Sequence, residues 1–122
     1  LYYGKIAIFK MKLDLHEIEI LCLAHITKSA KCMEKLLARQ VKEEHFTYIA
    51  PGDKHSYTNA IFRLIFEYWS ESGGSLFTDF VFESKLLEYS FSERNKAKLL
   101  NVWSEISDCE VDENNFYQIL DQ

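Results

Sequence analysis

The feature that most constrains the fold is the stretch 57–70, YTNAIFRLIFEYWS, in which apolar side chains recur every three or four residues. They cover so much of a helical surface that only Asn59, Arg63 and Glu67 remain to face water. A helix of this kind is expected at the centre of a domain. The glycine pair 73–74 predicts its end, because glycine adopts the left-handed cap conformation without a Cβ clash.

Other helices are predicted around this one from apolar periodicity and from residues that suit an N-cap. Asp14, Ser29, Thr78, Ser92 and Asp112 each precede such a pattern. The helices are expected over residues 14–27, 29–40, 79–89, 92–108 and 112–122. The last four of these helices are expected to turn their apolar faces inward, through Met33, Leu36, Leu37, Phe82, Leu86, Leu87, Leu99, Leu100, Trp103, Ile106, Phe116, Ile119 and Leu120. The sequence thus predicts an all-α, compact bundle of about six helices with short loops.

The ends of the chain and its one proline give further expectations. Pro51-Gly52-Asp53 predicts a turn before the central helix, and Lys5–Phe9 is rich enough in Ile and Phe to form a strand or an extended arm. Met11 fits a natural start, so residues 1–10 are interpreted as a tag or upstream extension, and 11–122 as the helical domain. Because the last helical pattern still continues at Gln122, we expect its helix to be truncated.

Composition narrows the class of function. The 122 residues carry 14 basic and 19 acidic side chains, a net charge of -5, so the domain is a poor candidate for tight nucleic-acid binding. Three widely spaced cysteines favour a reducing, cytoplasmic setting. The apolar runs are too short to span a bilayer, and Leu1–Lys10 lacks the pattern of a signal peptide. These features predict a protein partner.

The sequence predicts no catalytic, cofactor or metal site. Neither a Gly-x-x-x-x-Gly-Lys-Ser/Thr nor a Gly-x-Gly-x-x-Gly motif is present, and the histidines form no metal-binding pattern. His25 is expected to be a satisfied histidine of the core or of its edge, whereas His45 and His55 are expected to be exposed in loops. Glu17 and Glu19, with Glu43 and Glu44, are interpreted as a solvated face, because adjacent or alternate residues on a helix do not converge on one site.

Three motifs carry a resemblance to a known family. They are Glu-x-x-Ile-Leu at Glu17–Leu21, the pair His45-Phe46, and Ile-Phe-x-x-Ile-x-x-Tyr at Ile61–Tyr68, which precedes the glycine turn. In this order and spacing the chain resembles the N-terminal domain of DnaB-type replicative DNA helicases, particularly those of bacteriophages. The resemblance covers about Leu15 to Leu120, while Leu1–Lys10 has no counterpart in that family.

The resemblance implies a collar domain without an active site of its own. In that family the N-terminal domains form a trimer of dimers in a hexameric ring, and they dock primase and often a helicase loader. ATP and Mg²⁺ are bound by a separate motor domain. The implied setting is the cytoplasm of a bacterium or a phage-infected host.

The density of aromatic residues suggests that some lie in an interface. The interface candidates are Phe77, Phe80, Tyr89, Phe116, Ile119 and Leu120. The alternative hypothesis is a freestanding helical adaptor or regulator that binds a host or phage protein. An enzyme that uses the histidines and carboxylates of this chain is the third and weakest hypothesis.

Overall fold

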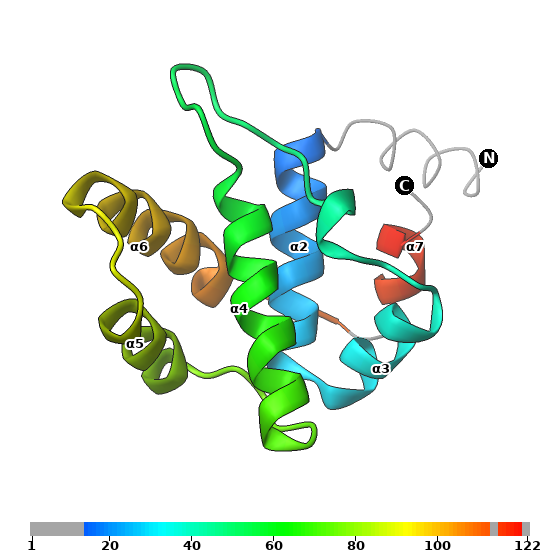
Figure 1. Ribbon diagram of the computed structural model, residues 1–122. Helices are drawn as coiled ribbons and strands as arrows, with labels where there is room; N and C mark the ends of the chain where they lie inside the picture. The colour runs from blue at the N-terminus through cyan, green and yellow to red at the C-terminus, as the bar shows by residue number, and fades with distance from the viewer. Residues whose placement is uncertain (1–13, 113–114, 121–122) are drawn as a thin grey trace.

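Helices α2 (Leu15–Lys28) and α4 (Tyr57–Ser72) lie side by side in the middle of the structure, as Figure 1 shows. The computed structural model describes residues 14–112 and 115–120. Around α2 are packed α3 (Ala30–Ala38), α6 (Glu93–Asp108) and α7 (Phe116–Leu120). The sequence predicts the stretch 57–70 as the one central element. In the structure α4 shares the centre with α2, which contacts α3, α4, α6 and α7.

The remaining elements are η1 (Glu43–His45), a single 3-10 turn that packs on α4, and α5 (Asp79–Glu88). In Figure 1, α5 and α6 lie on one side of the α2–α4 pair, and α3 and α7 lie on the other. The described residues contain helices and no strand, which confirms the all-α prediction for this part of the chain. The strand or arm predicted at Lys5–Phe9 lies outside the described residues.

Most helix starts are set by the capping side chains that the sequence indicates. The Asp14 carboxylate accepts a hydrogen bond from the Glu17 amide at 2.8 Å. The hydroxyls of Ser29, Thr78 and Ser92 likewise accept from amides three residues on, at 3.3, 3.3 and 3.1 Å. Each bond satisfies an amide that has no partner within its helix. Asp112 is different, because α7 begins only at Phe116.

Two glycines take positive φ angles where the chain must turn. Gly73 ends α4 with φ of 73°, and the next amide, of Gly74, donates to the Trp69 carbonyl at 3.0 Å. Gly52 has φ of 86° in the turn at Pro51, closed by a 3.0 Å bond from the Asp53 amide to the Ala50 carbonyl. Both predicted turns are confirmed.

The core is built from side chains of every long helix. An aromatic cluster joins α5 to α6: Phe82 stacks on Trp103 at 4.7 Å, and Phe77 meets Trp103 edge-on at 5.5 Å. The Trp103 indole donates to the Asp79 carboxylate at 2.7 Å, so the polar atom of this large side chain is satisfied. This cluster fixes α5, the helix at the lower left of Figure 1, against the rest of the bundle.

The prediction of a core position is wrong for two leucines. Leu87 is 85% exposed and Leu100 is 46% exposed, whereas their neighbours Leu86 and Leu99 are buried. Consecutive residues on a helix point about 100° apart, so a pair of adjacent leucines cannot both face a narrow contact. The bundle buries one member of each pair and leaves the other on the surface.

No helix in the described residues combines the length and the hydrophobicity needed to cross a membrane.

Candidate functional site

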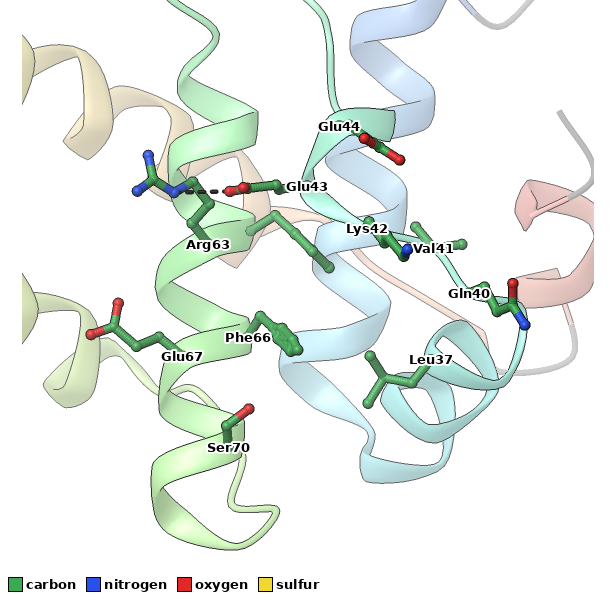
Figure 2. Close-up of a pocket in the computed structure, with 11 residues that line it drawn as sticks. Leu37, Gln40, Val41, Lys42, Glu43, Glu44, Arg63, Phe66, Glu67 and Ser70 are labelled. Atoms are coloured by element: carbon green, nitrogen blue, oxygen red, sulfur yellow. Dashed lines mark ion pairs between the residues drawn. The ribbon is translucent and has the colours of Figure 1, made fainter.

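A hollow on the surface lies between the end of α3, the η1 turn and α4, and we call it the α3–α4 groove. It encloses about 690 Å³. Figure 2 shows α2 behind the space between α3 and α4, with the lining side chains on both sides. The lining residues are Leu37, Gln40, Val41, Lys42, Glu43, Glu44, Phe62, Arg63, Phe66, Glu67 and Ser70.

The floor of the groove is apolar. Phe62 is buried and stacks on Phe46 at 4.5 Å, while Phe66, one turn along α4, remains 38% exposed. Leu37 and Val41 are half-buried at the end of α3 and just after it. In Figure 2, Leu37 and Phe66 extend toward each other across the groove. The helical pattern predicts that Phe66 is turned away from water, and this prediction is wrong because the space beside α4 is open.

Charged residues form the rim on the η1 side. Arg63 Nε lies 2.9 Å from a Glu43 carboxylate oxygen, which neutralises the arginine, as the dashed line in Figure 2 marks. The Asn59 side chain donates to the backbone carbonyls of Glu43 and Phe46 at 2.7 and 3.1 Å. These bonds attach the η1 turn to α4 and hold this wall of the groove in place.

A second polar cluster lies where α4 meets α5. Lys85 is buried, and its Nζ lies 3.2 Å from Glu71 and 3.7 Å from both Glu67 and Glu88. Burial alone would lower the pKa of Lys85, but the hydrogen bond to Glu71 and the three negative charges raise it above its ordinary value. The Tyr89 hydroxyl donates to Glu67, and this bond raises the pKa of Tyr89. The cluster holds one cation among three carboxylates.

The prediction of a solvated face is wrong for Glu19. Its carboxylate is buried and accepts from the amides of Thr47 and Tyr48 at 2.9 and 3.2 Å, and from the Thr58 hydroxyl. A single side chain of α2 therefore ties the chain after η1 to the first turn of α4. The signal was present in the sequence, since Glu19 lies between Ile18 and Ile20 within a long apolar run.

The structure separates the six interface candidates into exposed and buried residues. Phe80 is 76% exposed, and Tyr89 and Leu120 are half-buried. Phe77, Phe116 and Ile119 are buried, so the ring of Phe77 is not exposed as suggested, whereas Phe116 faces inward as its helical pattern predicts. Each of these two packs against another ring of the chain, Phe77 on Trp103 and Phe116 on His25 at 5.0 Å. A role of Phe80 in an interface stays a prediction.

The four histidines have different surroundings. His25 is buried beside Cys32, and His45 and His55 are exposed, as predicted. His16 Nε2 lies 3.1 Å from a carboxylate oxygen of Glu105 on α6. Within residues 14–112 and 115–120, no three His, Cys, Asp or Glu side chains come together in a group that could hold a metal ion.

The cysteines differ in their accessibility. Cys22 and Cys32 are buried, and Cys109 is partly exposed. Burial, together with the nearby Glu19 and Cys32, raises the pKa of Cys22 to about 12. Burial also raises the pKa of Cys109, although the charge of Lys28 works in the opposite direction.

We expect only Cys109 to react readily with a thiol reagent in the native protein at about pH 8, because it is partly exposed whereas Cys22 and Cys32 are buried. Raising a thiol's pKa leaves less thiolate at a given pH, so Cys22 should react only after unfolding. Titration with Ellman's reagent, with and without denaturant, measures this difference. Cys109→Ser should abolish the native reaction, and rapid labelling of two or more thiols in the native protein would contradict the burial described above.

Comparison of the chain with protein-family models, with curated proteins and with solved structures finds no match. The described residues form a helical domain, and its α3–α4 groove has an apolar floor that is open to solvent.

Proposed function

We propose that this chain is the N-terminal collar domain of a DnaB-type replicative helicase. In this role it mediates ring assembly and docks primase, a helicase loader, or both, during DNA replication. Hydrolysis of ATP with Mg²⁺ belongs to the motor domain of the parent protein. The proposal places the protein in the cytoplasm of a bacterium or a phage-infected host.

One contact between two motifs of the resemblance supports this proposal. Glu19 is an unspecified position inside the first motif, and it accepts hydrogen bonds from the Thr58 hydroxyl and from the amides of Thr47 and Tyr48, which lie outside the other motifs. Phe46, from the second motif, stacks on Phe62 of the third. This contact holds the second and third motifs together in one core.

One observation favours assembly with further copies: the outer face of α5 carries two unpartnered apolar side chains. Phe80 and Leu87 are 76% and 85% exposed and lie seven residues apart, which places them on the same side of the helix. Large apolar groups grouped on one surface are typical of interfaces. We therefore assign Phe80 and Leu87 to the contact with a neighbouring subunit.

Sedimentation velocity at increasing protein concentration tests this assignment. The wild-type chain is expected to self-associate weakly, with an average sedimentation coefficient that rises with concentration. The double variant Phe80→Ser/Leu87→Ser should stay monomeric over the same range. Ile49→Ser, which also removes a half-exposed apolar side chain but in a loop, is the matched control and should behave as wild type.

A wild-type chain that remains monomeric at the highest concentration, or an equal effect of Ile49→Ser, would count against the collar proposal. The alternative, a freestanding adaptor, draws its support from the α3–α4 groove, which can serve a partner without any ring. The two differ in what the gene encodes after Gln122. A phosphate-binding loop within a hundred or so codons favours the helicase, and a stop codon favours the adaptor.

A further inference from the structure

The two exposed apolar side chains of α5 are accompanied by a negative charge. Glu83 lies three positions after Phe80 and four before Leu87, so the three side chains share one side of the helix, which we call the α5 face. Glu83 is exposed, and its carboxylate forms no hydrogen bond or ion pair within the part of the chain that the structure describes. The one basic residue of α5, Lys85, is buried. The α5 face is therefore apolar with an acidic centre.

A basic stripe, made of Lys31, Lys35 and Arg39, follows the outside of α3. These residues are spaced four positions apart, so they lie on one side of the helix and of the residue that caps its end. Lys31 and Arg39 are exposed, and Lys35 is half-buried. Leu37 of the α3–α4 groove is two positions from both Lys35 and Arg39, so the stripe points away from the groove. Ala38, seven positions after Lys31, adds a small exposed residue beside the charges.

The α5 face and the basic stripe belong to opposite sides of the molecule. In Figure 1, α5 lies on one side of the α2–α4 pair and α3 lies on the other. A contact between the two surfaces therefore joins two copies of the chain. Each copy would contribute α5 to one neighbour and α3 to the next. A contact of this head-to-tail kind forms a ring when the rotation between copies closes, and an open chain otherwise.

Antiparallel pairing of two α5 helices is the other way for a second copy to cover the α5 face. It would set Phe80 of each copy on Leu87 of the other, and the point midway between these positions falls at Glu83 and Ser84. The two Glu83 carboxylates would then lie side by side, and like charges at a contact repel each other. The α5 face therefore favours a receiving surface that is basic.

We propose that the α5 face of one copy docks on the basic stripe of a second copy. Glu83 pairs with Lys31, since neither side chain has a partner among the described residues. The long apolar stems of the lysines and of Arg39 cover Phe80 and Leu87. The inference rests on the proposed assembly role, and it names the surface that receives α5.

Exchange of the two charges, followed by sedimentation velocity of the full chain, tests this contact. Glu83→Lys and Lys31→Glu should each weaken self-association by about fivefold or more, because each places like charges across the contact. The double variant Glu83→Lys/Lys31→Glu restores opposite charges and should associate within about twofold of wild type. Lys54→Glu, which reverses an exposed lysine in the loop before α4, is the matched control and should leave association unchanged. Circular dichroism establishes that each variant is folded.

Two results would overturn the contact between α5 and α3 while the chain still associates. One is an equal effect of Lys31→Glu and Lys54→Glu, or a loss in the double variant that is the sum of the two single losses. The other is tighter association of an equimolar mixture of wild type and Glu83→Lys than of either protein alone, because α5 would then pair with α5.

The outcomes for this contact and for the collar proposal are distinct. Loss of association in Phe80→Ser/Leu87→Ser without a specific effect of Lys31→Glu keeps the collar and removes the α3 contact. Rescue by the double variant, in a chain whose gene ends after Gln122, keeps the contact and removes the collar. A wild-type chain that stays monomeric at the highest concentration contradicts both.

Discussion

Glu19→Ala is expected to lower the free energy of unfolding by about 2–4 kcal/mol. The carboxylate accepts from two backbone amides, of Thr47 and Tyr48, and from the Thr58 hydroxyl. Truncation leaves these donors without their acceptor and breaks the link between α2, the chain after η1 and α4. Urea unfolding followed by far-UV circular dichroism measures the change.

Glu17→Ala is the matched control, two residues away on the exposed side of the same helix. It removes an acidic side chain from the first turn of α2, whose effect is expected to stay below about 1 kcal/mol. Equal losses for the two variants would mean that the buried carboxylate does not hold these segments together. A Glu19→Gln variant should fall between alanine and wild type, because its amide retains only one acceptor oxygen.

Phe62→Ala is expected to lower the free energy of unfolding by about 3–5 kcal/mol. The ring is 1% exposed, stacks on Phe46 at 4.5 Å and lies at the base of the α3–α4 groove. Its removal leaves a cavity between α4 and the chain after η1, in addition to the lost transfer of the ring from water. The same urea titration provides the measurement.

Phe66→Ala is the control for this cavity, since it removes the same ring from the next turn of α4. Because Phe66 is 38% exposed, its loss should lower the free energy of unfolding by only about 1–2 kcal/mol. If Phe66→Ala proved as destabilising as Phe62→Ala, the Phe66 ring would be buried and the groove would be closed in solution.

The helices could be predicted from sequence because their signals are local. The caps at Asp14, Ser29, Thr78 and Ser92 bond to amides three residues away, and Gly73 ends α4 by its own backbone freedom. No distant residue is needed for any of these interactions. The same holds for the absence of familiar catalytic motifs, which is a property of the sequence itself.

Local sequence patterns could not predict most of the α3–α4 groove. No sequence pattern separates Phe62, which is buried, from Phe66, which borders the groove, because both are apolar residues of one helix. Residue type also fails to predict burial at Leu87 and Lys85. The leucine is exposed, and the lysine is buried among carboxylates from two helices.

The sequence by itself determined the all-α class, the positions of most helix starts and the turns at Gly52 and Gly73, because each depends on contacts within a few residues. Only the tertiary structure decided which apolar side chains are buried, where Glu19 finds its partners and where a groove stays open. Those outcomes depend on which helices pack together. A residue's environment is then set by neighbours that can be dozens of positions away in the chain, as Glu19 and Thr58 are.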